Sequence, residues 1–579
     1  MPKKKTWLAV LFLVVLLASV TAAAAGSVPN VTPEMETADF WIGKLSDPDS
    51  VIMSQGEISA FNRDIIQAQP GLVFDLTDYP SSISGSVLSN LVTNRPFPVD
   101  EERYCNGWLV ERAYYDNLLR QMNLPGIGES NKVAWAVTVR RSNIRTFPTY
   151  DESLEAPDDI EFDLFQETAV SPAEPVLVLH RSLDGSWCFV QIYNYNGWMP
   201  AADLAVAEDK DIWLEYVRPE NYLVVTGNKV GIYFRQDNFA AELVELTMGA
   251  RVPLAGEGKE SSGAYSVKLP VRGDNGELLV EAASIPAGSD VSVGYMRYTR
   301  ANIIRQAFKI LGERYGWGGM FNGRDCSAFV MDVYKSFGLM LPRNGDEQER
   351  SAGRTASFES LGTEQRYGLV ASLLPGASLH TPTHEMLYLG EHNGLHYVIH
   401  DITSYGEINS DGSIGKAVLN RVAVTDLSLT RRNGMTFIDS LTGGKQIEPA
   451  SMPDKPPVNY YVSVFVNGDP VSFPDQQPYL DTSAGRVYVP LRFVSEALGA
   501  DVEWVQEEQK IVINKGNRVI MLHSGSREVY VDSRIYTMDV AVELVNGRNM
   551  VPLRFVSEAL GAQVEWTASG RGGRVDITE

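Results

Sequence analysis

The sequence predicts a multidomain protein in which an α+β module follows all-β barrels and precedes an α/β repeat. Three observations predict this fold class. Residues 131–295 consist of short alternating apolar runs separated by turn residues, a pattern typical of antiparallel strands. Residues 296–445 combine helical periodicity with later strand-like runs. Near the end of the chain, residues 489–500 recur unchanged as residues 551–562, which indicates a structural repeat.

Length and composition indicate several folded modules. A chain of 579 residues is long enough for about three to five domains. Its 44% apolar and 21% charged residues are typical of globular proteins rather than disordered chains. The net charge is −23, and no basic run follows the first residues. Nucleic acid is therefore not expected as a partner, and neither is bulk attraction to anionic polymers.

Residues 1–25 are expected to be a secretory signal peptide. Lysines at 3–5 precede an apolar run at 7–20 and a cluster of alanines at 22–25. No cysteine follows closely, so a lipoprotein anchor is not expected. An uncleaved anchor is the alternative, because the uncharged stretch is nearly long enough to span a bilayer. The protein is expected to be exported, extracellular or wall-associated, with no other membrane-spanning segment.

The next three segments are expected to support the α+β module. Residues 26–130 predict a mostly helical and irregular brace. Residues 131–208 and 209–295 each predict a barrel of short strands, with a more diverged pattern in the second. The acidic insertion 158–163 in the first barrel is expected to be a solvated loop, and a cationic subsite is the alternative.

A candidate nucleophile opens the second helix of the α+β module, residues 296–445. The glycine-rich stretch 315–319 precedes Asp325 and Cys326. Apolar residues then recur at helical spacing, and Gly338 ends the pattern. Asp325 is the expected N-cap, and the positive end of the helix dipole is expected to favour the thiolate of Cys326. Buried packing is the alternative role for this cysteine.

The candidate base lies on a hairpin. Five of the seven histidines fall between residues 380 and 400, and Asn393-Gly394 predicts the turn between two strands. A two-residue turn would pair His392 with Leu395, and strict alternation would then place His384 and His400 on opposite faces. If both are catalytic, the hairpin needs an odd-length loop or a β-bulge.

The histidines and cysteines raise the alternatives of a metal site and a disulfide. The four-residue spacing of the histidines would align metal ligands only on a helix, and no His-Glu-x-x-His motif occurs, so no metal or other cofactor is expected. Cys105 and Cys188 could pair if Cys326 stays free. A buried, unpaired Cys188 is the simpler interpretation, because it lies between two aromatic residues in a strand-like run.

The C-terminal region is expected to be a separate module. Residues 446–459 contain four prolines and predict a linker. In residues 460–579, each copy of the repeat predicts a strand, a short helix and a strand, with Pro490 or Pro552 at the helix start and Gly499 at one helix end. Repetition indicates architecture rather than catalysis, and a lone His523 cannot build a copper site.

The motif residues resemble those of NlpC-type cell-wall cysteine peptidases. That family carries Tyr-x-Trp-Gly-Gly, then Asp-Cys-Ser-Gly-Phe, then Gly-His before a Tyr-Leu-Gly strand, then a third polar residue. This chain has all four elements, with Ala328 and Thr383 replacing family glycines. The resemblance implies a papain-like α+β fold in which Cys326 is the nucleophile, His384 the general base and His400 the residue that orients the imidazole.

The same resemblance implies further roles and flanking modules. It places Asp325, Ser327 and Tyr315 in the substrate site, at the amine end of a peptide. Residues 26–130 resemble the N-terminal clip of one branch of the family. The barrels resemble bacterial SH3-like domains, through Asn-Ile-Arg at 143–145 and Gly-Trp at 197–198. The repeat at 460–579 is similar to the copper amine oxidase N-terminal-like domain, which implies no copper.

These resemblances imply an exported peptidoglycan hydrolase that acts on stem peptides, with the γ-D-glutamyl–diamino acid bond as the expected cleavage point. An N-acetylmuramoyl-L-alanine amidase is the alternative enzyme, and a wall-binding protein with a decayed peptidase module is the non-enzyme alternative. Peptidoglycan or its stem peptides are the expected partners, while the oligomeric state stays open. A barrel beside the groove, with Asp325 as amine partner, predicts a preference for free stem peptides.

Overall fold

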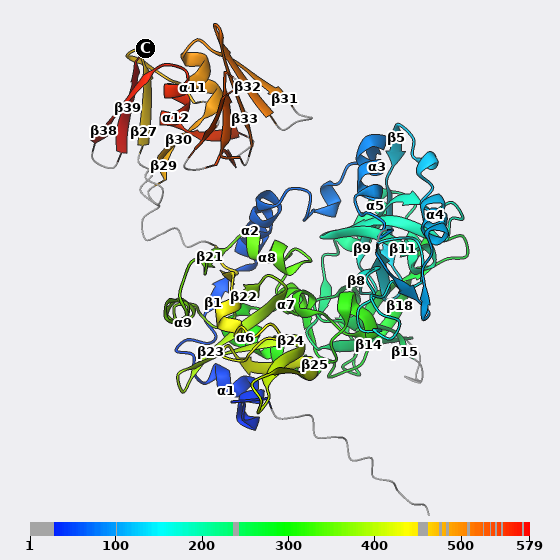
Figure 1. The fold of residues 1–579 in the computed structure, drawn as a ribbon. Helices are drawn as coiled ribbons and strands as arrows, with labels where there is room; N and C mark the ends of the chain where they lie inside the picture. Colours follow the sequence, from blue (N-terminus) through cyan, green and yellow to red (C-terminus); the bar gives the residue numbers. More distant parts are fainter. Residues whose placement is uncertain are drawn as a thin grey trace, which may run out of the picture. The chain divides into compact units, whose positions relative to one another are not determined.

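The structure is a computed structural model of the chain. It describes residues 28–99, 101–234, 242–449, 461–473, 478–481, 486–505, 510–524, 526–532, 534–538, 541–545, 548–569 and 572–578. The expected signal peptide lies outside the described residues, as does most of the expected linker. The chain forms two compact units that divide between residues 449 and 450 (Figure 1).

The N-terminal part of the first unit braces the modules that follow. Its elements are α1 (Ala38–Ile42), β1 (Val51–Met53), α2 (Gln55–Ala68), β2 (Ser82–Ser84), α3 (Gly85–Thr93), β3 (Tyr104–Cys105), β4 (Trp108–Leu109), α4 (Arg112–Gln121) and β5 (Ser130–Lys132). Trp41 and Phe61 are buried in the same apolar core as the helices of the α+β module. Tyr115 and Leu118 are buried with the barrels instead. The N-terminal segment thus packs against both the α+β module and the barrels.

The first barrel is a seven-stranded antiparallel sheet in the order β12-β6-β9-β10-β11-β7-β8. Its strands are β6 (Ala134–Thr138), β7 (Ser142–Arg145), β8 (Gln166–Val170), β9 (Pro175–Arg181), β10 (Trp187–Ile192), β11 (Tyr195–Pro200) and β12 (Leu204–Val206). Helix α5 (Lys210–Val217) follows, and its Trp213 packs against Trp135 with ring centroids 5.0 Å apart. This contact anchors the connection to the second sheet.

The second sheet also has seven strands, in the order β15-β14-β18-β17-β16-β13-β19. They are β13 (Tyr222–Val225), β14 (Lys229–Phe234), β15 (Glu242–Thr247), β16 (Arg251–Lys259), β17 (Tyr265–Arg272), β18 (Leu278–Ile285) and β19 (Val291–Val293). Its buried residues Leu223 and Val267 share one apolar core with Trp135 of the first barrel. The two sheets therefore pack as a single body.

The α+β module is built on a six-stranded sheet in the order β21-β26-β22-β23-β24-β25. Its elements are β20 (Tyr298–Thr299), α6 (Arg300–Phe308), α7 (Cys326–Lys335), α8 (Gly345–Arg350), β21 (Arg354–Ser357), α9 (Thr363–Ala371), β22 (Ser378–Thr381), β23 (His384–His392), β24 (Leu395–Ile408), β25 (Ile414–Asp426), α10 (Phe437–Ser440) and β26 (Gly443–Gln446). Leu387 and Ile399 face α6 and α7, whereas Met386 and Val398 face α9 and α10. The sheet therefore has helices on both faces.

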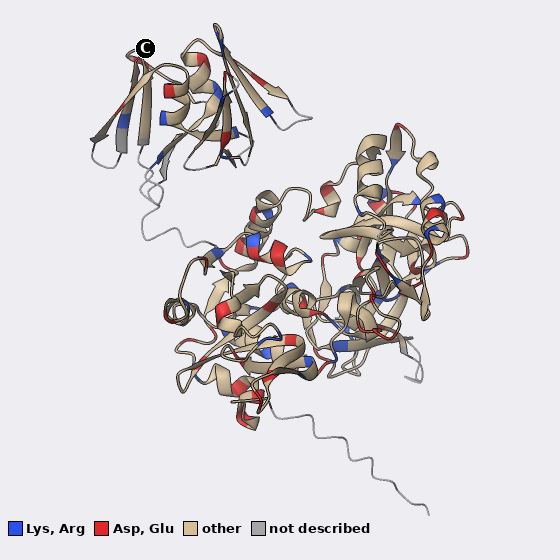
Figure 2. Cartoon of the chain, in the orientation of Figure 1, with Lys and Arg blue, Asp and Glu red and all other residues tan. Residues whose placement is uncertain are grey.

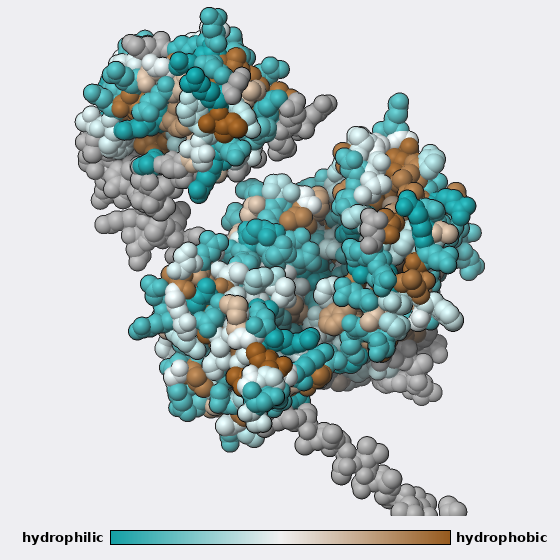
Figure 3. All heavy atoms as spheres, viewed as in Figure 1, coloured by the Kyte–Doolittle hydropathy of each residue, from teal (hydrophilic) through white to brown (hydrophobic). Residues whose placement is uncertain are grey.

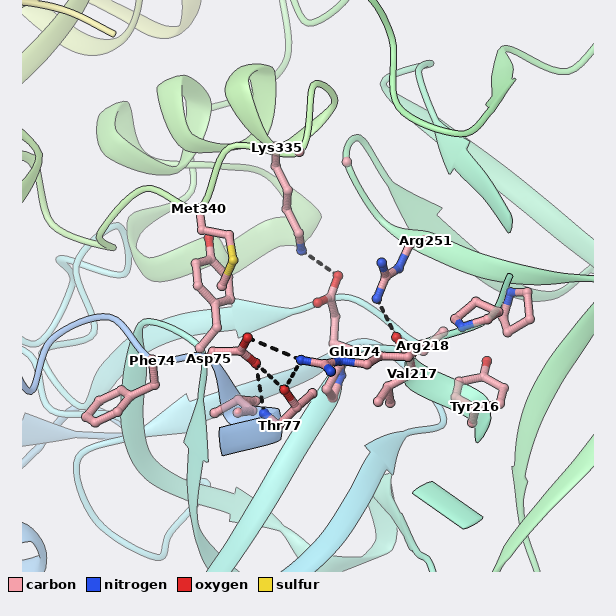
Figure 4. A pocket seen from close by; sticks show the side chains of 18 of the residues that line it. Phe74, Asp75, Thr77, Glu174, Tyr216, Val217, Arg218, Arg251, Lys335 and Met340 are labelled. Atoms are coloured by element: carbon pink, nitrogen blue, oxygen red, sulfur yellow. Dashed lines mark hydrogen bonds and ion pairs between the residues drawn. The ribbon is translucent and has the colours of Figure 1, made fainter. Parts of the chain in front are cut away.

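A cavity of about 240 Å³ lies where the brace, both barrels and α7 meet (Figure 4). Lys335 at the end of α7 forms an ion pair with Glu174 of the first barrel. On the other side of the cavity, Arg218 pairs with Asp75 of the brace. Ion pairs between modules thus line this cavity, which sits at the opposite end of α7 from Cys326.

The second unit contains the two repeat copies. Its elements are β27 (Tyr461–Val466), β28 (Asp469–Pro470), β29 (Tyr479–Asp481), β30 (Arg486–Pro490), α11 (Leu491–Ala497), β31 (Asp501–Val505), β32 (Lys510–Lys515), β33 (Arg518–His523), β34 (Glu528–Val531), β35 (Arg534–Thr537), β36 (Glu543–Val545), β37 (Arg548–Pro552), α12 (Leu553–Ala559), β38 (Gln563–Ser569) and β39 (Gly572–Thr578). Each copy is a strand, a short helix and a strand, as expected. The copies pair with each other, with Val489 opposite Val551.

The predicted fold class, α+β with all-β barrels before it and an α/β repeat after it, is confirmed. Charged residues of both signs are interspersed over both units (Figure 2), and apolar residues form separate small groups on the face seen in Figure 3. All three cysteines are free, and Cys188 is buried. Within the described residues, no helix has the length and hydrophobicity needed to span a membrane.

Candidate active site

Cys326 is the first residue of α7, as the sequence predicts. Asp325 caps the helix, with its Oδ1 accepting a hydrogen bond from the backbone N–H of Ala328 at 2.9 Å. Phe329 and Val333 are fully buried and fix the helix against the sheet. The helix ends at Lys335, and Gly338 follows in the left-handed region at φ +91°. The core contacts of α7 therefore hold Cys326 in place.

The glycine-rich turn before Cys326 needs its glycines. Gly318 and Gly319 have φ values of 54° and 87°, which favour glycine. A Cβ at Gly319 would lie 2.4 Å from the Cβ of Ala169 in β8. Gln166 Nε2 donates to the carbonyl of Gly318 at 2.8 Å. The turn therefore lies directly against the first barrel.

Asp325 also belongs to a buried ion pair. Arg343 Nη2 lies 2.6 Å from Asp325 Oδ2, and Nη1 lies 3.1 Å from Oδ1. The backbone N–H of Gly318 donates to the same carboxylate at 3.0 Å. Arg343 also donates to Ser327 Oγ at 2.9 Å and to Thr168 Oγ1 of the first barrel at 2.6 Å. Asp325 is therefore fully engaged with the protein.

The hairpin contains the β-bulge that the geometry required. His392 pairs with Leu395 across the tight turn, but the register shifts between Tyr388 and Gly390. Beyond the shift, His384 and His400 lie on the same face of the sheet. His384 Nε2 and His400 Nδ1 are 2.7 Å apart, and both rings pack against Phe437. Of the two expected alternatives, an odd-length loop or a β-bulge, the structure has the bulge.

A third residue extends this chain of contacts. His400 is fully buried, and its Nε2 lies 3.0 Å from the hydroxyl of Thr425 in β25. If that nitrogen donates to Thr425, then Nδ1 of His400 accepts from Nε2 of His384. Nδ1 of His384 is then the ring nitrogen that can take a thiol proton. Thr425 had no role in the sequence-based prediction.

Cys326 and His384 line one pocket of about 390 Å³. The acidic insertion of the first barrel contributes Glu161 and Phe162 to the lining of this pocket. Glu161 accepts hydrogen bonds from Arg314 at 2.9 and 3.1 Å, and Phe162 packs against Trp317 with ring centroids 5.6 Å apart. The insertion is therefore a wall of the pocket rather than only a solvated loop.

The resting protonation state is a neutral pair. Burial, and then the nearby Arg431, lowers the pKa of His384 to about 3. Burial and then Asp325 raise the pKa of the Cys326 thiol above its ordinary value, although a backbone hydrogen bond from Glu385 acts in the opposite direction. The expected thiolate is thus not favoured in this state. Burial and the Asp325 carboxylate both act against the thiolate form that the helix dipole was expected to favour.

Two further acidic residues lie close to Cys326. Burial raises the pKa of Asp401 to about 9, and Asp325 and Glu313 add to this. Burial raises the pKa of Glu385 well above its ordinary value as well. No hydrogen-bond partner for either carboxyl group occurs among the residues that the structure describes. Asp401 is therefore protonated near neutral pH, and burial favours the protonated form of Glu385, whose Oε1 lies 3.8 Å from His380 Nε2.

The structure brings together only some of the predicted site residues. Tyr315, Cys326 and His384 line the pocket, and His400 lies behind His384. Asp325 and Ser327 do not line it, because both are bound to Arg343 behind its wall. The sequence-based prediction assigned no role to Arg343, although it lies in the Leu341-Pro-Arg-Asn344 stretch after α7. Further pocket residues that it missed are Asp401, Lys416, Arg431 and Arg432.

Three family models match this chain. Residues 312–421 match the NlpC/P60 family, residues 148–200 match the SH3 domain of the SH3b1 type, and residues 465–572 match the copper amine oxidase N-terminal domain. These domains occur in the order that the sequence predicted. The three matches fall within the α+β module, the first barrel and the repeat unit, respectively.

Curated relatives and a solved structure add to these matches. The chain is 33% identical over 141 residues (24% of this chain) to a protease inhibitor of Brevibacillus choshinensis, and 26% identical over 248 residues (40% of this chain) to a gamma-D-glutamyl-L-lysine dipeptidyl-peptidase of Bacillus cereus. It spans 40% and 66% of those relatives. An NlpC/P60 endopeptidase structure from Photobacterium damselae subsp. piscicida aligns with 71% of this chain and 97% of its own, at 18% identity and a TM-score of 0.58, which shows a shared fold.

Proposed function

We propose that this protein is a cysteine endopeptidase and that its substrates are peptidoglycan stem peptides. The premise is that residues 312–421 form an NlpC/P60 domain. One observation carries the proposal. The Cys326 thiol and the His384 imidazole line the same pocket, and His400 hydrogen-bonds to His384 from behind. A nucleophile, a base and an orienting group are the three parts that covalent catalysis by cysteine needs. The signal segment of the sequence favours export.

The proposed reaction starts from the neutral pair. As Sγ of Cys326 attacks the scissile carbonyl, its proton passes to Nδ1 of His384. His384 then gives that proton to the departing amine, and a thioester remains on Cys326. Water, deprotonated by His384, attacks the thioester and releases the new carboxylic acid, which ionises. Sγ of Cys326 leaves as thiolate and takes back the proton from His384, which restores the neutral pair. Throughout, His400 and Thr425 hold the imidazole ring in one orientation.

Asp325 and Ser327 have a different role in this proposal from the one that the resemblance implied. Because Arg343 engages both side chains, we assign them to positioning Cys326 rather than to contact with a substrate amine. Tyr315 stays in contact with the substrate, since it lines the pocket beside Phe162 of the first barrel.

The closed end of the pocket favours a free stem peptide over a glycan-linked one. In this proposal, the amino end of the peptide lies against Glu161 and Phe162, which line the pocket, and a continuing glycan strand would meet the first barrel there. The bond that fits this arrangement is the γ-D-glutamyl–diamino acid amide, two residues from the amino end. An N-acetylmuramoyl-L-alanine amidase would have to seat the glycan against this wall.

The test is digestion of purified muropeptides and of free stem peptides, followed by mass spectrometry. We expect release of L-Ala-γ-D-Glu from free peptides, and much slower cleavage of the same peptides when N-acetylated or attached to glycan. The Cys326→Ala variant is the control for contaminating hydrolases. Release of intact stem peptides from glycan would instead establish the amidase, and no cleavage of any substrate would support a binding protein.

A further inference from the structure

One end of the candidate active-site pocket is basic. Lys416, Arg431 and Arg432 line it, and we refer to these three residues as the basic end. Across the described parts of the chain, none of the three forms an ion pair with an acidic side chain. Such a group is unusual in a chain with a net charge of −23, because Asp and Glu are available in excess to neutralise it.

The basic end lies away from the first barrel. Alternate residues of β25 line the pocket, from Asn420 through Val418 to Lys416. Asn420 Nδ2 donates to Glu161 at 3.3 Å, so this position marks the part of the pocket that the first barrel lines. Lys416 lies four residues from Asn420 along β25, beyond the register shift that pairs Ile402 with Arg421 and Ser404 with Val418. Arg431 donates to Thr383 Oγ1 at 2.9 Å, next to His384.

No acidic group of the pocket compensates this charge. Glu161 is already paired with Arg314. Burial raises the pKa of Asp401 to about 9, so this carboxyl is neutral near pH 7. Burial also lowers the pKa of Arg431, and no acidic neighbour opposes that effect. A partly desolvated guanidinium beside two exposed cations is a site that an anion would stabilise.

We propose that the basic end binds a carboxylate of the leaving group, the part of the peptide that follows the scissile amide. This inference rests on the proposed function. With the amino end of the peptide at the barrel wall, the chain runs past Cys326 and His384 towards Lys416. The C-terminal carboxylate of a short stem peptide is the anion that reaches this end, whereas the α-carboxylate of D-Glu lies beside the scissile bond. The site thus selects peptides with a free carboxyl terminus.

The experiment compares three peptides with a free amino end. They are L-Ala-γ-D-Glu-L-Lys-D-Ala, its C-terminal amide, and the form in which D-isoglutamine replaces D-Glu. We expect kcat/KM for the first to exceed that for the C-terminal amide by about tenfold at low salt, and the ratio to shrink as ionic strength rises. The D-isoglutamine peptide should keep the preference for a free carboxyl terminus. If the preference instead follows the D-Glu carboxylate, the assignment to the leaving group is wrong.

Two double variants test the residues. Lys416→Gln with Arg432→Gln should lower kcat/KM for the free-acid peptide to about that for its amide. Lys132→Gln with Lys268→Gln removes the same charge from exposed positions on other strands, and it should preserve the preference. A preference that survives in the first double variant, or is lost equally in both, would overturn the proposal.

A binding measurement separates this inference from the proposed function. In the Cys326→Ala variant, L-Lys-D-Ala and its amide are titrated and followed by NMR. Tighter binding of the acid, lost with Lys416→Gln and Arg432→Gln, supports the basic end even if no peptide is cleaved. Equal binding of acid and amide, alongside normal cleavage by the wild type, rejects the inference and leaves the peptidase assignment intact.

Discussion

Asp325 and Asp401 are both buried near Cys326, yet their environments have opposite effects. Asp325 accepts from Arg343 and from two backbone N–H groups, and these interactions outweigh burial and lower its pKa. Asp401 has no hydrogen-bond partner among the described residues, and burial raises its pKa to about 9. Asp325 is therefore a charged partner in a buried ion pair, whereas Asp401 is a neutral carboxylic acid. Partners, rather than depth, decide the charge.

The largest effect on activity is expected from removing the Cys326 thiol, which lies near both aspartates and is the proposed nucleophile. Cys326→Ala should abolish peptide hydrolysis, because no other group of the pocket can form the thioester. Thermal unfolding should change little, since the lost side chain is small and partly exposed. Hydrolysis at the wild-type rate in this variant would remove the basis of the whole mechanism.

Removing the ion pair between Arg343 and Asp325 should destabilise the fold. Arg343→Gln leaves a buried carboxylate without its cation, which should lower the free energy of unfolding by about 3–5 kcal/mol. Chemical denaturation measures this. The matched control is Arg354→Gln, whose side chain is half-exposed and lies 3.9 Å from Glu448. Its removal should cost less than about 1 kcal/mol. Similar losses in the two variants would contradict the special role of the Asp325–Arg343 pair.

Replacing the buried carboxyl group of Asp401 with a neutral amide should stabilise the protein. Its folded pKa of about 9 lies above its ordinary value of 3.8, so unfolding releases a proton throughout the neutral range. Asp401→Asn removes this penalty and should raise the free energy of unfolding at pH 7 by roughly 2–4 kcal/mol. The gain should vanish below about pH 4, where the carboxyl is protonated in both states. Asp274→Asn, in an exposed turn, is the control. A gain that does not change with pH would exclude the titration of Asp401 as its cause.

Much of this site follows from local sequence, because caps and apolar periodicity act within a few residues. The helix that begins at Cys326, its cap at Asp325 and the need for a bulge between His384 and His400 could all be predicted. The place of the bulge could not, since both strands have similar alternation. The thiolate expectation considered only the helix dipole, whereas burial and Asp325 raise the pKa of the Cys326 thiol.

The remaining features depend on contacts that are remote in sequence. Arg343 meets Asp325 across 18 residues, and the wall formed by Glu161 reaches Arg314 across 153 residues. Nothing local distinguishes these residues from ordinary surface charges. Asp401 follows His400 on a strand, where alternation alone suggests an exposed position. Only the packed structure shows that both faces of β24 are covered, which makes this carboxyl a buried acid.

His400 is an intermediate case between the two aspartates. It has a hydrogen-bond partner, unlike Asp401, but that partner is the neutral hydroxyl of Thr425 rather than a cation such as Arg343. This gives the smallest predicted effect. Thr425→Val keeps the shape but removes the acceptor for Nε2 of His400, so that the tautomer that receives a bond from His384 is no longer fixed. One hydrogen bond contributes about 0.5–1.5 kcal/mol, so kcat should fall by about tenfold or less, with KM nearly unchanged. Thr425→Ser retains the hydroxyl and should restore most of the rate. If Val and Ser lower kcat equally, the methyl packing of Thr425 matters rather than its hydrogen bond, and the orienting role of His400 must rest on His384 alone.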